Sequence, residues 1–400
     1  MASDSIAIGW RPSSLSGWGV YGTNLALQLK KQGRNPVLYL APHRLDLDAD
    51  ALRILKPVLQ RQPHLDELLQ KIGVLDFDFP VLHALRNDFH PPMEDQVARG
   101  KPNVGVIFFE DTEISAGGLE RARGYDLIVA GSHWNRHIAE ARGLTNVVTV
   151  LQGVDTHQFH PQPRADRFKD RFVVFSGGKL EYRKAQDVVI AAFRAFHARH
   201  PEALLMVAWG NQWPAIMPTI ERSPYVDGKP EEGADGTLNI DAWLMRNGVP
   251  AGSYLDLGMA PNRAMPGFLA SADVALFPNR CEAGTNLVAM EAMAAGIPTI
   301  LTLNTGQLDI ANSKQWPDHC YELRIQRPVA PYEPYAGTDG WGEPDLDETI
   351  EALEAAYADG DRRKRIGAAG AEFMRQLDWS TQIGELVRQI DSVVDAIAPK

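Results

Sequence analysis

One stretch of the sequence restricts the possible folds more than any other. Apolar residues at 273–277 predict a buried strand, and the Ala- and Met-rich residues after a short polar turn predict a helix. Thr285 or Asn286 can cap the start of this helix, and Gly296 ends it. A buried strand that leads through a short turn into a helix is a building unit of α/β domains.

The start of this predicted helix is suited to bind an anion. Its backbone N–H groups at 284–287 lack partners within the helix, and the helix dipole adds about half a positive charge there. Glu291 lies inside the helix with its side chain tilted back toward this end, where a carboxylate can accept hydrogen bonds from ribose hydroxyls. Glu282, ahead of the turn, can reach a second polyhydroxyl group. The stretch indicates a nucleotide-sugar site, and the alternative is an ordinary strand–helix unit with two solvated glutamates. The candidate donor-binding residues are Gly284, Thr285, Asn286, Leu287 and Glu291, and Glu282 is a candidate catalytic residue.

The two glutamates resemble the E-x7-E signature of family-4 retaining glycosyltransferases of the GT-B fold. Glu291 matches the ribose-binding glutamate of that signature. Glu282 lies nine residues before Glu291 instead of eight, so Ala283 occupies the position of the first glutamate. The resemblance implies a ribose contact for Glu291 and leaves the contact of Glu282 with the donor sugar open.

Length and composition limit the classes of protein to which this chain can belong. Four hundred residues predict two domains. The net charge of −11, from 51 acidic and 40 basic residues, argues against a nucleic-acid or anionic-membrane partner. We expect no membrane span, no signal peptide and a cytoplasmic location, because no apolar run reaches ~18 residues and the two cysteines suit a reducing compartment. Cys281 is expected to be a packed residue and not a nucleophile.

Strands and helices alternate along both halves of the chain, which predicts parallel sheets covered by helices on both faces. The segment 152–161 resembles the linker between the two domains of these glycosyltransferases. The resemblance implies two Rossmann-like, doubly wound domains that face each other across a cleft. We expect an acceptor domain at 1–160, to which a C-terminal helix at 380–400 returns, and a nucleotide-sugar domain at 161–379. The Pro/Gly-rich segments 214–236 and 328–345 are expected to form a surface insertion and a loop.

A glycine-rich segment follows the first predicted strand, and Gly17, Gly19 and Gly22 formally match G-x-G-x-x-G. A dinucleotide site is disfavoured, because the loop before Gly17 is too long and the second strand is followed by no acidic residue. The resemblance implies instead a Gly-rich loop that closes on the donor diphosphate and sugar, and the alternative is a flexible loop without this role. The corresponding candidate donor-binding residues are Gly17, Trp18 and Gly19.

A basic segment follows the strand predicted at 172–176. Lys179 and Lys184 match the basic pair of the G-R-L-x-x-x-K-G loop of these enzymes, with Lys179 in place of Arg and Ala185 in place of Gly. Fixed cations at this position would stabilise the charge of a departing nucleoside diphosphate. The alternative is two solvated surface lysines. The candidate catalytic residues are Lys179 and Lys184, and Gly178, Gly258 and Met259 are candidates for donor and base contacts through the backbone.

An acidic segment follows the strand predicted at 104–108, at the sheet edge where ligands of open α/β sheets bind. Glu110 or Asp111 is a candidate for orienting the acceptor or stabilising an oxocarbenium-like centre, and a solvated acidic loop is the alternative. Several D-x-D pairs occur, such as Asp345 with Asp347, but Asp345 is better explained as a helix cap. We assign no metal ligand and expect no cofactor.

Together these features predict a glycosyltransferase that moves a sugar from a UDP- or GDP-sugar to an acceptor with retention of anomeric configuration. The acceptor class, whether small molecule, glycan or protein, is left open. The alternatives are a sugar phosphorylase, a nucleotide-sugar epimerase and a nucleotide-sugar-binding protein without catalysis. A dehydrogenase is the least favoured of the alternatives.

Overall fold

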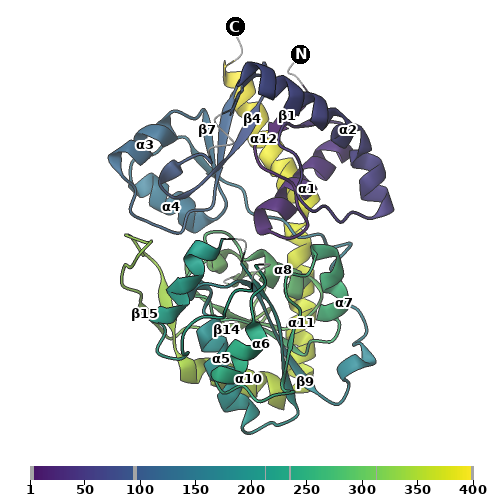
Figure 1. The fold of residues 1–400 in the computed structure, drawn as a ribbon, viewed down its shortest axis with the longest axis vertical. Coiled ribbons are helices and arrows are strands. Elements are labelled where there is room, and N and C mark those ends of the chain that lie inside the picture. Colours follow the sequence, from purple (N-terminus) through teal and green to yellow (C-terminus); the bar gives the residue numbers. More distant parts are fainter. Residues whose placement is uncertain (1–3, 93–96, 212, 234–235, 312, 398–400) are drawn as a thin grey trace. The chain divides into compact units, whose positions relative to one another are not determined.

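The computed structural model describes residues 4–92, 97–211, 213–233, 236–311 and 313–397 (Figure 1). Contacts between residues divide the chain into two compact units. The first comprises Met1–Gly153, Pro261–Arg263 and Leu377–Lys400, and the second comprises Val154–Ala260 and Ala264–Gln376. The chain first passes between the units after Gly153, whereas the sequence placed the boundary after residue 160.

The first unit contains a six-stranded parallel sheet with the strand order β2-β1-β4-β6-β7-β8. Alternation of short apolar strands with helices produces this arrangement, as predicted. The sheet strands are β1 (Ser5–Ile8), β2 (Asn35–Leu38), β4 (Val81–Leu85), β6 (Asn103–Ile107), β7 (Leu127–Ala130) and β8 (Val147–Thr149), and β3 (Leu75–Asp76) pairs with β5 (Ala98–Arg99). The helices are α1 (Gly17–Lys31), α2 (Ala49–Ile72), α3 (Ala116–Arg123), α4 (His133–Ala141) and α12 (Trp379–Ile397).

The second unit contains a parallel sheet with the order β11-β10-β9-β12-β13-β14. Counted within the unit this order is 3-2-1-4-5-6, the order of a Rossmann fold. The strands are β9 (Phe172–Lys179), β10 (Ala203–Gly210), β11 (Tyr254–Asp256), β12 (Val274–Phe277), β13 (Thr299–Thr302) and β14 (Tyr321–Leu323). The helices are α5 (Gln186–His197), α6 (Ile240–Arg246), α7 (Met265–Leu269), α8 (Leu287–Ala294), α9 (Leu308–Ala311), α10 (Leu346–Ala358) and α11 (Gly360–Met374).

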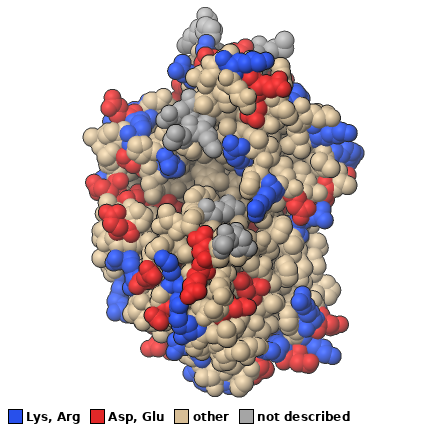
Figure 2. All heavy atoms as spheres, in the orientation of Figure 1, with Lys and Arg blue, Asp and Glu red and all other residues tan. Residues whose placement is uncertain are grey.

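The C-terminal helix α12 packs on the first unit, against α1. Its apolar residues Ile383, Leu386 and Ile390 are buried. Trp379, the first residue of the helix, stacks on Tyr21 of α1 with ring centroids 5.3 Å apart. None of the described helices combines the length and apolarity that a membrane span requires. On the face drawn in Figure 2, acidic and basic side chains are interspersed.

Two segments of the second unit are more ordered than the sequence predicted. The expected surface insertion contains a 3-10 helix, η5 (Pro214–Arg222), which buries Met217 and Ile220 in the core. The expected loop at 328–345 ends in strand β16 (Gly342–Pro344), which pairs antiparallel with β15 (Gln326–Pro328). The physical reason in both segments is buried apolar or aromatic surface, which Pro and Gly content does not reveal. In the second segment that surface comes from Tyr332, Tyr335 and Trp341.

The predicted flexible loop at Gly17–Gly22 is wrong, because these residues form the first turns of α1. The Ser16 hydroxyl caps the helix by accepting a hydrogen bond from the Gly19 amide at 3.1 Å. Gly19 and Gly22 are required by close contacts and not by flexibility. A Cβ at Gly19 would lie 2.3 Å from the Cβ of Ser13, and one at Gly22 would lie 2.7 Å from Nε1 of Trp10.

This correction predicts different results for two substitutions in the same turn. Gly17 has open space at its Cβ position, so Gly17→Ala should leave stability unchanged or raise it by up to about 1 kcal/mol. Gly19→Ala should destabilise by about 1–3 kcal/mol, since the added methyl group meets the backbone and side chain of Ser13. Thermal unfolding of the two full-length variants tests this, and equal melting temperatures would favour the flexible loop.

Candidate functional site

The topology of the second unit singles out one edge of its sheet. Strand order reverses between β9 and β12, and open α/β sheets bind ligands outside the carboxyl ends of the two strands at such a point. The segments that leave these ends are residues 180–186 and residues 278–287. They contain the predicted site residues Lys184 and Glu282.

The basic segment is held in one conformation by two residues with positive φ. Gly178 has φ +123°, which only glycine adopts readily, and Ala185 has φ +57° in the left-handed region. Between them, Lys179 ends β9, and Lys184 ends a 3-10 turn, η4 (Tyr182–Lys184). Ala185 stands where the related loops carry glycine, and it adopts the backbone conformation for which glycine is favoured.

A buried carboxylate that the sequence analysis did not single out neutralises part of this basic segment. Glu181 is fully buried, and its carboxylate lies 3.1 Å from Nζ of Lys179 and 2.8 Å from the guanidinium of Arg183. The Tyr335 hydroxyl donates a hydrogen bond to it at 3.2 Å. Burial alone would raise the pKa of Glu181, but Arg183, Lys179 and Lys184 hold that pKa below its usual value.

Lys184 and Glu282 form an ion pair across the switch point, with Nζ 2.5 Å from Oε1. Asn279 also donates its side-chain amide to Glu282, and Arg183 lies 3.5 Å from Oε2. Both charged side chains are largely buried, at 14% exposure for Lys184 and 5% for Glu282. Burial lowers the pKa of Lys184, and its pairing with Glu282 offsets this only in part. The structure therefore brings two predicted residues together, with each engaged by the other.

Arg280 connects the segment 278–287, to which it belongs, to the segment 180–186. It is fully buried, and its guanidinium makes two hydrogen bonds to Asp187 (2.8 and 2.6 Å) and two to Glu343 (2.5 and 2.8 Å). A fifth bond, of 2.6 Å, runs to the carbonyl oxygen of Tyr182, whose ring lies 3.8 Å from the guanidinium carbon. Asp187 belongs to α5 and Glu343 to β16, so one side chain fixes four segments around the candidate site.

Helix α8 begins at Leu287, and its N-cap is Asn286, one of the two residues that the sequence offered for this position. The Asn286 backbone is left-handed, with φ +63°, and its side-chain oxygen accepts from the amide of Ala289 at 3.3 Å. The turn before it packs on Gly306, where a Cβ would lie 2.2 Å from the carbonyl oxygen of Gly284. The amide of Glu282 donates to Oγ1 of Thr305 at 2.8 Å.

The remaining predicted residues of the second unit lie in or near these segments. Thr285 is buried and its hydroxyl contacts Sδ of Met290 at 2.9 Å. Glu291 is buried within α8. Gly258, after β11, has φ +59°, and its amide donates to Asp256 at 2.8 Å. Met259 beside it is exposed.

Four predicted residues belong to the first unit. Gly17, Trp18 and Gly19 lie in the first turns of α1, and Trp18 packs edge-on against Trp10 and Phe108. Glu110 follows β6, as expected, and its amide donates to Oδ1 of Asn87 at 2.9 Å. The roles of these four residues on donor and acceptor stay predictions.

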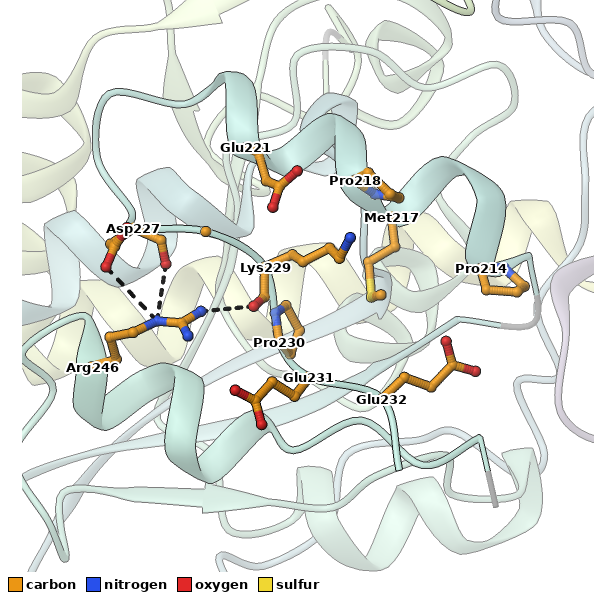
Figure 3. A pocket seen from close by; sticks show the side chains of 11 residues that line it. Pro214, Met217, Pro218, Glu221, Asp227, Lys229, Pro230, Glu231, Glu232 and Arg246 are labelled. Atoms are coloured by element: carbon orange, nitrogen blue, oxygen red, sulfur yellow. Dashed lines mark hydrogen bonds and ion pairs between the residues drawn. The ribbon is translucent and has the colours of Figure 1, made fainter. Parts of the chain in front are cut away.

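A hollow of about 610 Å³ lies elsewhere in the second unit, between η5 and the segment 227–232 (Figure 3). Arg246 anchors one wall by donating to the carbonyl oxygens of Asp227 (3.2 Å) and Lys229 (2.7 Å). Its lining includes Glu221 and Met217 but none of the predicted site residues. The chemistry that we assign below therefore rests on the sheet edge and not on this hollow.

Comparison with known proteins identifies relatives of both the sequence and the fold. Residues 246–316 match the family model described as Glycosyl transferases group 1, and this range covers β11 to α9 and both glutamates. A GDP-mannose-dependent alpha-(1-6)-phosphatidylinositol dimannoside mannosyltransferase of Mycobacterium tuberculosis is 28% identical over 197 residues. That alignment covers 47% of this chain and 44% of the relative, so the match spans less than half of the mannosyltransferase.

Solved structures match the whole chain at low sequence identity. HepE of Anabaena, in complex with UDP and glucose, superposes with a TM-score of 0.65 at 13% identity, covering 98% of this chain and 100% of that one. Sucrose-phosphate synthase of Thermosynechococcus elongatus gives 0.63 at 14% identity, covering 97% and 99%. The UDP-forming trehalose-phosphate synthase of Burkholderia vietnamiensis gives 0.60 at 14%, covering 100% and 99%. These likenesses confirm the predicted GT-B fold.

For a nucleoside diphosphate bound at Lys184, as the sequence predicts, the buried ion pair predicts that binding takes up protons. The pKa of Lys184 lies below the usual 10.5 in the free protein, and a bound diphosphate would favour the charged ammonium and raise that pKa. Affinity for UDP or GDP should therefore fall as the pH rises through the lowered pKa. Calorimetry in two buffers of different ionisation enthalpy measures the uptake.

The matched control is Lys184→Arg, whose guanidinium keeps its charge throughout this range. This variant should bind the diphosphate without this proton uptake. The same uptake in parent and variant would assign it to a group other than Lys184.

Proposed function

We propose that this chain is a glycosyltransferase that transfers a sugar from a nucleotide-diphosphate-sugar donor to an acceptor, with retention of anomeric configuration. One observation carries the proposal: an ion pair joins Lys184, in the segment after β9, to Glu282, in the segment that leads into α8, where the strand order reverses. The match of residues 246–316 to a glycosyltransferase family model supports it independently.

The proposed donor position follows from the charges at this edge. The diphosphate lies at Lys179, Lys184 and the amides that begin α8, since cations and a helix N-terminus both favour anions. Glu291 holds the ribose, and Gly258 and Met259 contact the base. When the diphosphate binds, it replaces the Glu282 carboxylate as the partner of Lys184, and Glu282 then contacts the donor sugar.

The donor nucleotide is proposed as UDP or GDP. The mannosyltransferase relative is described as GDP-mannose-dependent, and HepE is described in complex with UDP. A thermal-shift screen over UDP-, GDP- and ADP-sugars would distinguish the two, because a ligand at 100 times its Kd adds about 2.7 kcal/mol of stability.

The rival functions differ in what they turn over. Phosphate-dependent cleavage would indicate a sugar phosphorylase, and conversion of the nucleotide sugar without an acceptor would indicate an epimerase. Tight donor binding without turnover on a broad acceptor panel would favour a binding protein. The observation that most favours a binding protein is that Lys184 and Asn279 already occupy the Glu282 carboxylate.

The two lysines should act mainly on charge that develops in the transition state. Breaking the bond between the anomeric carbon and a diphosphate oxygen leaves negative charge on that oxygen, which fixed cations stabilise. Lys179→Ala and Lys184→Ala should each lower kcat at saturating donor by about 10²–10³-fold, by analogy with oxyanion-hole donors. The double variant should lose less than the product of both effects, because one diphosphate contacts both residues. Steady-state kinetics measures these losses.

The same assay tests our proposal that no metal ion takes part. EDTA should leave the parent rate unchanged, and added Mg²⁺ should restore little activity to either variant. Near-parent kcat in both single variants, or loss of parent activity with EDTA, would contradict the mechanism and direct attention to the D-x-D pairs.

The two glutamates should separate donor sugar from nucleotide. Glu291→Gln should weaken binding of the nucleoside diphosphate by about 1.5–3 kcal/mol, the cost of a charge-assisted hydrogen bond. Glu282→Gln should impair binding of the nucleotide sugar and turnover, yet should not weaken nucleoside diphosphate binding, because in the proposed complex the diphosphate replaces this carboxylate on Lys184. Calorimetry with UDP or GDP and with the corresponding sugar donor separates these effects. Equal weakening of both ligands by Glu282→Gln would assign this residue to the diphosphate or to the scaffold.

A further inference from the structure

Trp213 lies against Lys179 although 48% of its surface remains exposed. Nζ of Lys179 is 5.1 Å from the centroid of the indole ring, within the range of a cation–π interaction. Trp213 carries no sequence signature of a role, since it is a single aromatic residue beside a Pro-rich segment.

Backbone contacts place Trp213 at the same sheet edge as the basic segment. Strand β10 runs parallel to β9 with Gly210 opposite Lys179, so the residues after Gly210 leave the sheet beside Lys179. Asn211 connects the two segments through its side chain. Its Nδ2 donates to the carbonyl oxygen of Leu180 at 2.8 Å, and its Oδ1 accepts from the amide of Trp213 at 2.7 Å.

A second bond ties the following turn to the same loop. The amide of Tyr182 donates to Oγ1 of Thr219, in η5, at 3.1 Å. The backbone before and after Trp213 is therefore held by contacts with the segment that carries Lys179 and Lys184.

The two partners of Lys179 have different consequences for its charge. Glu181, at 3.1 Å, carries a full negative charge that opposes the approach of a phosphate group. The indole face attracts the ammonium through its quadrupole and carries no net charge. An ammonium held by an aromatic ring thus keeps its field available to an incoming anion.

On this basis we propose that Trp213 is a positioning residue that holds the Lys179 ammonium at the carboxyl end of β9 for the diphosphate of the donor. The inference rests on the proposed function, because it takes Lys179 as a diphosphate ligand. Trp213 itself needs no contact with the donor.

The test is a double-mutant cycle on UDP and GDP affinity, measured by calorimetry with the full-length chain. Trp213→Leu removes the ring and should weaken binding by about two- to fivefold, as expected for an exposed cation–π interaction. Trp213→Phe keeps an aromatic face and should restore most of the affinity. In a Lys179→Gln background, Trp213→Leu should have no further effect.

Met245, exposed on α6 of the same unit, supplies the control. Met245→Ala removes a comparable exposed apolar side chain and should leave the affinity unchanged. Thermal melting of each variant shows whether the unit stays folded.

Different results contradict different parts of the argument. Equal weakening by Trp213→Leu with and without Lys179 would overturn the positioning role and favour direct stacking of the ring on the ligand. Full parent affinity in Trp213→Leu would also overturn it. Absence of UDP and GDP binding in the parent would contradict the proposed function itself.

Discussion

The candidate site depends on the buried guanidinium of Arg280. Its two carboxylate partners come from α5 and from the β15–β16 hairpin, more than 150 residues apart in sequence. Breaking such a buried network by removing one partner is costly, because the other charges stay buried without compensation. The carbonyl oxygen of Tyr182 binds the same guanidinium, and the amide of Arg280 donates to the carbonyl of Arg183 at 2.8 Å. The backbone that presents Lys184 is thus fixed to the backbone that presents Glu282.

Most of the positive charge at the candidate site is neutralised by carboxylates of the protein itself. Lys179, Arg183 and Lys184 face the carboxylates of Glu181 and Glu282, which leaves one positive charge in excess. A buried cluster with three unopposed cations would be expensive to desolvate. In the proposed donor complex, a diphosphate displaces Glu282 from Lys184 and pairs with the ammonium in its place. The internal carboxylates therefore stabilise the free protein. In the proposed donor complex, an incoming anion must replace the ion pair of Glu282, which favours a highly charged ligand.

The fold was predictable from the sequence, because strand–turn–helix units repeat with clear apolar runs, as at 273–296. The cap at Asn286 and the positions of Lys179 and Lys184 beside the switch point were predictable for the same reason. Glu181 and Arg280 were not, because each acts through partners distant in sequence, including Tyr335 and Glu343. The glycines of α1 were misread because close packing and backbone flexibility both require glycine. Only the contacts of Gly19 with Ser13 and of Gly22 with Trp10 distinguish the two reasons.

Ala185 has a consequence for the thermodynamics of ligand capture. A left-handed conformation costs an alanine about 1–2 kcal/mol, whereas glycine adopts it freely. Glycine at this position would also visit many other conformations, and a ligand would have to freeze them out. With alanine held in place by the surrounding contacts, much of that entropy is lost when the chain folds and not when the ligand arrives. In the proposed donor complex, the segment that carries Lys184 is therefore rigid before the diphosphate arrives, and binding of the diphosphate should carry a small entropic penalty.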